Sequence, residues 1–159
     1  MLVAQMMSRE MVTVPPQMPV QEVTRLLAQQ HVTALPVVDS DGLFVGLITE
    51  EDLIVRHANL HLPLYLNVLD GFFPFRGEHQ FQEEMRRVLA ATARELMNPK
   101  PVTVTPATDV ADAASLMIER HANPLPVIDG ARLVGLIGRR DIIRLMVLEE
   151  QQSDEPAAR

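Results

Sequence analysis

Hydrophobic and polar positions follow one pattern that occurs twice along the chain. A short β-prone run is followed by apolar residues at helical spacing, which in the first copy are Val20, Val23, Leu26 and Leu27. A continuous apolar run then predicts a buried strand, a turn rich in Asp and Gly predicts a hairpin, and a return strand leads into a second helix. The pattern predicts the element order β-α-β-β-α, twice, in an α/β (α+β) fold.

The helices of each copy have recognisable starts. Pro19 suits the first turn of the first helix, and Thr108 is expected to be the N-cap of its counterpart. The second helix is expected to begin near Glu50 in the first copy and near Arg139 in the second. The runs predicted to form strands in the first copy are 12–14, 35–38 and 44–48.

The two copies are a duplication. Val3–Ile54 aligns with Ala93–Ile143 with one gap in a turn, and identical residues recur in the same order. One such unit buries too little surface to be stable alone, so the copies are expected to pack with pseudo-twofold symmetry around a crevice suited to a ligand. The predicted domains are repeat 1 at 1–55, an ordered, mostly helical insert at 56–92, repeat 2 at 93–150 and a disordered tail at 151–159.

The repeated motifs identify a known family by resemblance. Val-Thr-Val begins at Val12 and again at Val102, and each copy ends in a Gly-Leu-Ile motif, Gly46–Asp52 and Gly135–Asp141. The repeats resemble CBS domains, and the pair resembles a Bateman module. This resemblance implies a regulatory protein that is not an enzyme and needs no cofactor. It also implies that an adenosine-containing ligand, such as AMP, ADP, ATP or S-adenosylmethionine, binds between the repeats.

The resemblance also implies which residues contact the ligand. In the family's Gly-x-x-Thr/Ser-x-x-Asp motif, the carboxylate contacts ribose and the hydroxyl contacts phosphate. Asp52 and Asp141 correspond to the carboxylate and Thr49 to the hydroxyl, which Gly138 replaces in the second copy. The residues implied to surround the adenine are Val12, Thr13, Ala34 and Leu35 in the first copy, and Val102, Thr103, Pro124 and Leu125 in the second.

Charge separates the two copies. Glu50–Glu51 would repel a phosphate, whereas Arg139 and Arg140 would attract it with a suitable geometry. We therefore expect one preferred nucleotide site, with Arg139 or Arg140 supplying charge; the alternative is that both are solvated surface residues. Thr49 and Asp52 also have a purely structural interpretation, because their spacing fits a helix N-cap with an acidic third position.

The histidines do not predict a metal site. His31 and His121 end equivalent helices, where a histidine is favourable. His57 and His61 have the i,i+4 spacing of a metal-binding pair, but no third ligand is evident. No Gly-rich phosphate loop and no nucleophile–base pair stands out, so no catalytic residue is predicted.

The segment 56–92 has no counterpart in the other repeat. It contains the only tyrosine and four of the five phenylalanines, and is expected to be ordered, either against its own repeat or as a dimer surface or lid. Its second part is predicted to be an amphipathic helix whose apolar face carries Phe81, Met85, Val88, Leu89, Thr92 and Leu96, opposite Glu83, Glu84, Arg86, Arg87 and Glu95.

Composition narrows the classes of function. The 159 residues include no cysteine, which excludes disulfides, thiol catalysis and cysteine metal sites. A net charge of −7 argues against a nucleic-acid binder. No apolar run is long enough to span a bilayer, and the first ten residues lack a secretory pattern, so a cytoplasmic location is expected.

The sequence predicts two kinds of partner. CBS pairs often form dimers, so a homodimer is expected, and a protein target is expected in trans because the chain contains no second domain to regulate. Two alternatives remain open: a ligand-free dimerisation or scaffold module, and an enzyme acting on a nucleotide.

Overall fold

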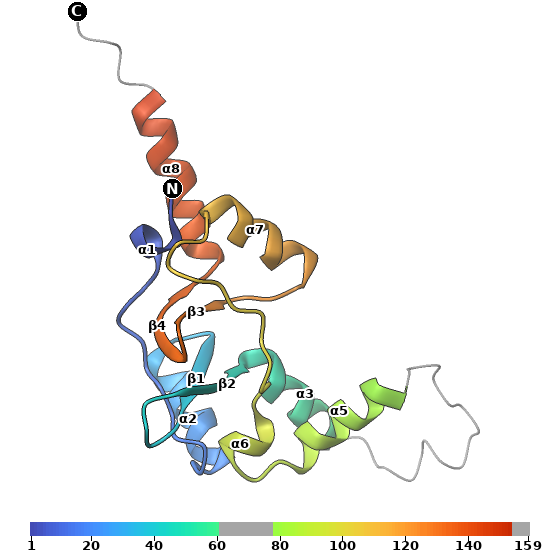
Figure 1. Ribbon diagram of the computed structural model, residues 1–159. Coiled ribbons are helices and arrows are strands. Elements are labelled where there is room, and N and C mark those ends of the chain that lie inside the picture. Colours follow the sequence, from blue (N-terminus) through green and yellow to red (C-terminus); the bar gives the residue numbers. More distant parts are fainter. Residues whose placement is uncertain (61–77, 154–159) are drawn as a thin grey trace, which may run out of the picture. The chain divides into compact units, whose positions relative to one another are not determined.

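The computed structural model describes residues 1–60 and 78–153, and the chain divides into two compact units, each containing a two-stranded sheet (Figure 1). We name the units by their strands. The β1–β2 unit comprises Val12–Asp41 and Val45–Pro99. The β3–β4 unit comprises Met1–Met11, Gly42–Phe44 and Lys100–Arg159.

The β1–β2 unit holds the first repeat. In chain order its elements are α2 (Val20–Gln30), β1 (Ala34–Val38), β2 (Phe44–Thr49), α3 (Glu50–Leu60), α5 (Glu78–Leu89) and α6 (Ala93–Leu96). The run expected as a strand at 12–14 makes only an isolated parallel bridge, between Val14 and Val37. Pro15 and Pro16 follow at once and have no N–H to continue a ladder.

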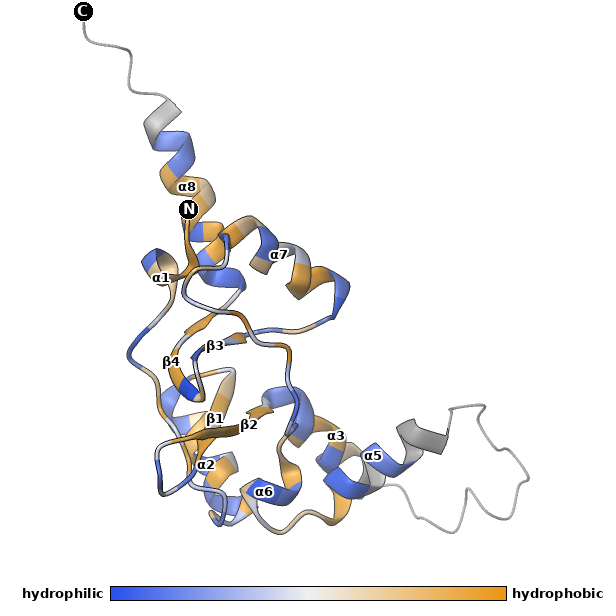
Figure 2. Ribbon diagram, in the orientation of Figure 1, coloured by the Kyte–Doolittle hydropathy of each residue, from blue (hydrophilic) through white to orange (hydrophobic). Residues whose placement is uncertain are grey.

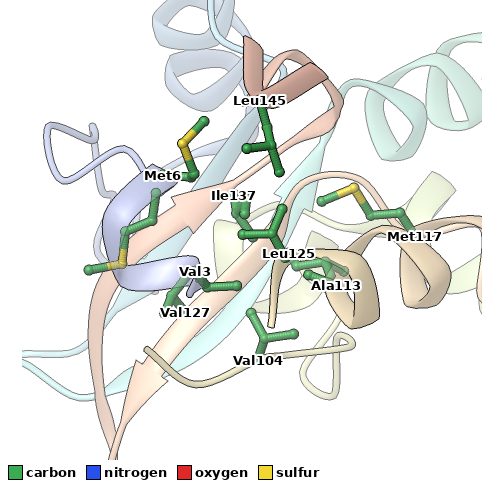
Figure 3. Packing of buried hydrophobic residues seen from close by; sticks show 11 residues of the cluster. Val3, Met6, Val104, Ala113, Met117, Leu125, Val127, Ile137 and Leu145 are labelled. Carbon is green, nitrogen blue, oxygen red and sulfur yellow. The ribbon is translucent and has the colours of Figure 1, made fainter. Parts of the chain in front are cut away.

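The β3–β4 unit begins with α1 (Val3–Met6) and then repeats the helix–strand–strand–helix order with α7 (Val110–Glu119), β3 (Leu125–Asp129), β4 (Arg132–Ile137) and α8 (Arg139–Ser153). β3 and β4 are antiparallel, and Figure 2 shows that their residues are mainly hydrophobic. Side chains from α1, α7, both strands and α8 converge on one core (Figure 3). Its labelled members are Val3, Met6, Val104, Ala113, Met117, Leu125, Val127, Ile137 and Leu145.

The short helices α1 and α6 are exchanged between the repeats. α1 precedes the first repeat in sequence but belongs to the β3–β4 unit, where Val3 N donates to Thr108 O at 2.9 Å. Ser8 and Leu136 exchange two backbone hydrogen bonds of 2.8 and 2.9 Å. α6 makes the equivalent bonds in the β1–β2 unit: Ala93 N to Met18 O, and the pair between Asn98 and Leu47. The two compact units therefore have different boundaries from the two sequence repeats. The domain boundaries predicted from the sequence stay a prediction.

The N-cap of α7 differs from the expected one. Asp109, not Thr108, caps the helix, because its Oδ1 accepts the N–H of Ala111 at 2.9 Å. Thr108 Oγ1 accepts the N–H of Thr105 instead, in the preceding turn. The hydrogen bond from Ala111 lowers the pKa of Asp109 below its usual value, because it stabilises the charged carboxylate. Thr108 and Asp109 are adjacent and both belong to residue types preferred at N-caps, which made this position ambiguous in the sequence.

The helix predicted along the second part of the insert is broken. α5 ends at Leu89 and α6 begins at Ala93, so the single apolar face predicted from 81 to 96 belongs to two helices. Arg56 of α3 stabilises the break, since its Nη1 donates to the backbone oxygens of Arg87, Val88 and Ala90. These bonds satisfy carbonyl groups that a continued helix would have used.

Two predictions fall partly outside the described residues. The aromatic residues Tyr65, Phe72, Phe73 and Phe75 lie in 61–77 and are not described. α8 continues to Ser153, three residues into the segment predicted as a tail, and the remainder of that segment is also outside the description.

Candidate ligand-binding site

The predicted residues of the first copy come together at one end of β1. The parallel bridge between Val14 and Val37 lays residues 12–13 alongside the start of this strand. Glu50 N donates to Thr33 O at 3.1 Å, which holds the first turn of α3 beside the same end. The residues placed there are Val12, Thr13, Ala34, Leu35, Thr49 and Asp52.

The second copy assembles in the same way with one difference. The bridge between Val104 and Val127 lays residues 102–103 alongside the start of β3. Arg139 N donates to the side-chain oxygen of Asn123 at 2.9 Å, where the first copy uses a backbone oxygen. The residues placed there are Val102, Thr103, Pro124, Leu125, Arg139, Arg140 and Asp141.

Three of the residues expected around the adenine, Ala34, Leu35 and Leu125, have buried side chains in the core. Leu35 and Leu125 are each 0% exposed and belong to the two hydrophobic clusters. Only their backbone groups could contact a ligand. Thr13 and Thr103 are exposed, so their hydroxyls are available.

Asp52 is already bonded within its own unit. Among the polar and charged residues that the structure describes, Asp52 is the one that is buried, with 4% of its surface exposed. Its Oδ2 accepts the backbone N–H of Thr49 at 2.8 Å and the Thr49 hydroxyl at 3.0 Å. The Thr49 hydroxyl therefore donates to Asp52, which supports the capping interpretation of this pair in the first copy.

The second oxygen of Asp52 faces a cation. Arg87 Nε of α5 lies 3.0 Å from Asp52 Oδ1, and the two side chains are 25% and 6% exposed. Arg87 Nε is buried yet makes no hydrogen bond, so the contact has the distance of an ion pair without the angle of a hydrogen bond. Both carboxylate oxygens of Asp52 thus have partners inside the chain.

Asp141 has one oxygen to spare. Its Oδ2 accepts the N–H of Gly138 at 2.8 Å, the same backbone bond that Asp52 makes with Thr49. Gly138 offers no hydroxyl, and Oδ1 of Asp141 has no hydrogen-bond or ion-pair partner in the described part of the chain. Asp141 is also half-buried rather than buried. A carboxylate oxygen in this state can accept hydrogen bonds from a ligand.

The first turns of α3 and α8 carry opposite charges. α3 begins with Glu50, Glu51 and Asp52, which suits the positive end of the helix dipole. α8 begins with Arg139 and Arg140, which the dipole disfavours. Both arginines are exposed, and neither side chain has a partner within 1–60 and 78–153. Residues that break a local stability rule in this way are expected at functional positions.

Sequence reasoning missed Arg87 and Asn123. Arg87 lies on the charged face of a predicted amphipathic helix, and such a face is ordinarily solvated. Nothing in the pattern of the insert indicates which repeat this face would meet. Asn123 could have been found from the alignment of the two repeats. It is the counterpart of Thr33, and the two repeats therefore differ in residue type at this position.

His31 and His121 lie at the ends of helices. His31 and His121 follow α2 and α7 with positive φ angles of 52° and 50°, a conformation common just past a helix end. No group of three metal-ligating side chains occurs among the residues described, and His61 is not one of those residues.

None of the described helices is long and apolar enough to cross a membrane.

Comparison with known proteins identifies the family. The model of the CBS domain matches residues 3–58 and 93–148, one match for each repeat. The chain therefore belongs to the CBS domain family and carries two copies of the domain, as the duplicated motifs predicted.

Relatives and solved structures agree with this assignment. The uncharacterised protein MJ1426 of Methanocaldococcus jannaschii is 31% identical over 79% of this chain and 80% of its own length. Chloroplastic CBSX1 of Arabidopsis thaliana is 28% identical over 91% of this chain, which spans 62% of CBSX1.

Two solved structures share the fold. The crystal structure of CBSX2 in complex with AMP has a TM-score of 0.75 at 24% identity and covers 92% of this chain and 97% of that one. The CBS pair of MJ0100, solved with 5′-methylthioadenosine and S-adenosylmethionine, has a TM-score of 0.69 at 23% identity, covering 94% and 98%. These likenesses confirm the predicted fold class of a CBS domain pair.

Proposed function

We propose that this protein is a regulatory module that binds an adenosine-containing ligand through its second repeat and signals its occupancy to a protein partner in trans. One observation carries this proposal. Asp141 keeps an unpartnered carboxylate oxygen beside two exposed arginines, whereas Asp52, its counterpart, has both oxygens engaged.

The chemistry of the second repeat suits a nucleotide. A carboxylate oxygen can accept hydrogen bonds from neighbouring ribose hydroxyls. The N-terminal turn of α8 offers positive potential to a phosphate, and Arg139 and Arg140 add two cations with a bidentate geometry. CBSX2 and the MJ0100 pair, which share this fold, were solved with adenosine compounds, which favours this ligand class.

The first test is calorimetric titration with AMP, ADP, ATP and S-adenosylmethionine. We expect saturable binding of at least one of them. Replacing both Arg139 and Arg140 by alanine should weaken the binding of a phosphate-bearing ligand about 10–100-fold, since we expect one of the two to bond the phosphate and a charge-assisted hydrogen bond contributes roughly 1.5–3 kcal/mol. S-adenosylmethionine, which has no phosphate, is the matched control and should lose little. Unchanged nucleotide affinity in the double variant would show that both arginines are only surface residues.

The two alternatives give different results with the same protein. A ligand present at a concentration of 100 times its Kd should raise the free energy of unfolding by about 2.7 kcal/mol. A nucleotide that does not change thermal unfolding would favour the ligand-free scaffold. Conversion of ATP during incubation, measured by chromatography, would favour an enzyme.

We also propose that the protein forms a homodimer through α8. This helix exposes Ile143, Met146 and Val147, at i, i+3 and i+4 spacing, with exposures of 60%, 55% and 47%. Arg139 and Arg140 precede the stripe on α8, and Glu149 and Glu150 follow it. Two antiparallel copies of α8 would cover the stripe and place the basic part of one against the acidic end of the other, as a twofold interface requires.

Light scattering tests the dimer. The protein is expected to be a dimer at micromolar concentration, and Met146→Glu should make it a monomer because it places a charge at the centre of the stripe. Ile118→Glu is the matched control, since Ile118 is 69% exposed on α7 and lies outside the stripe. A monomeric parent protein, or an equal effect of both variants, would contradict an interface on α8.

A further inference from the structure

The counter-charge of Asp52 comes from outside the repeat that contains Asp52. Arg87 lies on α5, in the segment that joins the repeats and has no counterpart after the second one. Within the described residues, Asp141 has no equivalent cation. The joining segment, rather than the repeat itself, therefore makes the two carboxylates different.

Arg87 is held in this position by the backbone around it. Arg56 follows Asp52 by one turn on α3, and its Nη1 donates to the carbonyl oxygens of Arg87 and Val88 at 3.0 and 2.8 Å. Asp52 and Arg56 thus present one face of α3 to the end of α5. Arg86 links the same end of α5 to the region of α6, because its Nη1 donates hydrogen bonds of 2.7 and 2.8 Å to Glu95 O and Met97 O.

The place beside Asp52 Oδ1 that Arg87 occupies is one that a ligand could use once this side chain is removed. Arg87 Nε is buried without a hydrogen bond, although it lies 3.0 Å from the carboxylate. Ribose hydroxyls could supply the linear hydrogen bonds to Asp52 Oδ1 that Arg87 does not. The anchors formed by Arg56 and Arg86 do not involve the guanidinium of Arg87, so α5 can stay in place when that side chain is removed.

We propose that Arg87 closes the first repeat to ligand, so that the segment between the repeats determines which of the two carboxylates is used. Removing Arg87 creates a second ligand site that depends on Asp52. The chemistry of the ligand, an adenosine compound, rests on the proposed function; the closing contact rests on the geometry of α3 and α5.

The test is the stoichiometry of AMP binding by the full chain, measured by calorimetry. The parent protein should bind one AMP per chain and Arg87→Ala two, the second more weakly because Glu50 and Glu51 repel its phosphate. Arg87→Lys is the matched control, because it keeps a cation opposite Asp52, and it should bind one. Combining Arg87→Ala with Asp52→Asn should restore a stoichiometry of one. Arg87→Gln, which keeps the length of the side chain without its charge, replaces the alanine variant if that variant does not fold.

The outcomes separate this inference from the proposed function. No AMP in the parent and one in Arg87→Ala would uphold the closing role of Arg87 and overturn ligand binding by the second repeat. One AMP in both proteins would overturn the closing role and leave the proposed function standing. No binding in either protein would overturn both. A loss of binding in Arg87→Ala would show that Arg87 contacts the ligand, which also overturns the closing role.

Discussion

Replacing Gly46 by alanine is expected to destabilise the protein by about 3 kcal/mol, which corresponds to a fall of roughly 10 °C in Tm. Gly46 is buried in β2, and a Cβ there would lie 2.5 Å from Met97 Sδ and 2.8 Å from Asn98 O. The thioether could move, but the backbone oxygen could not. Asn98 and Leu47 exchange two hydrogen bonds, of 2.9 and 3.0 Å, that fix the segment after α6 against β2.

The second repeat offers a graded comparison for this substitution. A Cβ at Gly135 would lie 2.7 Å from Met7 Sδ and 3.0 Å from Ser8 O, so Gly135→Ala should cost less, about 2 kcal/mol. At Gly138 the nearest atom would be Asn123 Oδ1 at 3.4 Å, and Gly138→Ala should change stability by less than about 0.5 kcal/mol. Denaturant unfolding measures all three. Equal effects at Gly46 and Gly138 would contradict the close packing of the exchanged segments.

The two glycines show what the sequence could and could not predict about the fold. Repetition of Val-Gly-Leu-Ile predicted two equivalent return strands, and the structure has both, as β2 and β4. The sequence did not predict why a glycine stands in each strand. The reason is the exchange of α1 and α6, in which Met7 approaches Gly135 and Met97 approaches Gly46. Local periodicity reports which residues are buried but not which distant segment covers them.

The candidate site was predictable to a similar extent. The repeat and the motif placed Asp52 and Asp141 in equivalent helical turns, and each accepts the same backbone hydrogen bond three residues earlier. Charge alone indicated that the second repeat is the better place for a phosphate. The sequence could not predict which carboxylate has a cationic partner. Arg87, which pairs with Asp52, lies 35 positions further along the chain, in a segment that has no counterpart in the other repeat. Tertiary contact, not motif identity, distinguishes the two aspartates.

Asp141→Asn is expected to weaken the binding of an adenosine ligand by about 30-fold, whereas Asp52→Asn should change it by less than about twofold. Asparagine keeps the shape of the side chain and the acceptor for Gly138 N, but it lacks the charged second oxygen that is free in Asp141. Losing charge-assisted hydrogen bonds to ribose removes roughly 2 kcal/mol of binding free energy. Calorimetric titration of both variants with AMP measures the difference.

Stability should respond in the opposite order, which makes the same pair of variants a test of folding as well as of binding. Asp52→Asn leaves the guanidinium of Arg87 partly buried without its counter-charge, and we expect a loss of roughly 2 kcal/mol in the free energy of unfolding. Asp141 has no cationic partner in the part of the chain described, so Asp141→Asn should cost under 1 kcal/mol. If Asp52→Asn lost affinity and Asp141→Asn lost stability, the roles assigned to the two repeats would have to be reversed. Because the substitution is chemically identical at both positions, any difference in its effects arises from the surroundings of the two carboxylates.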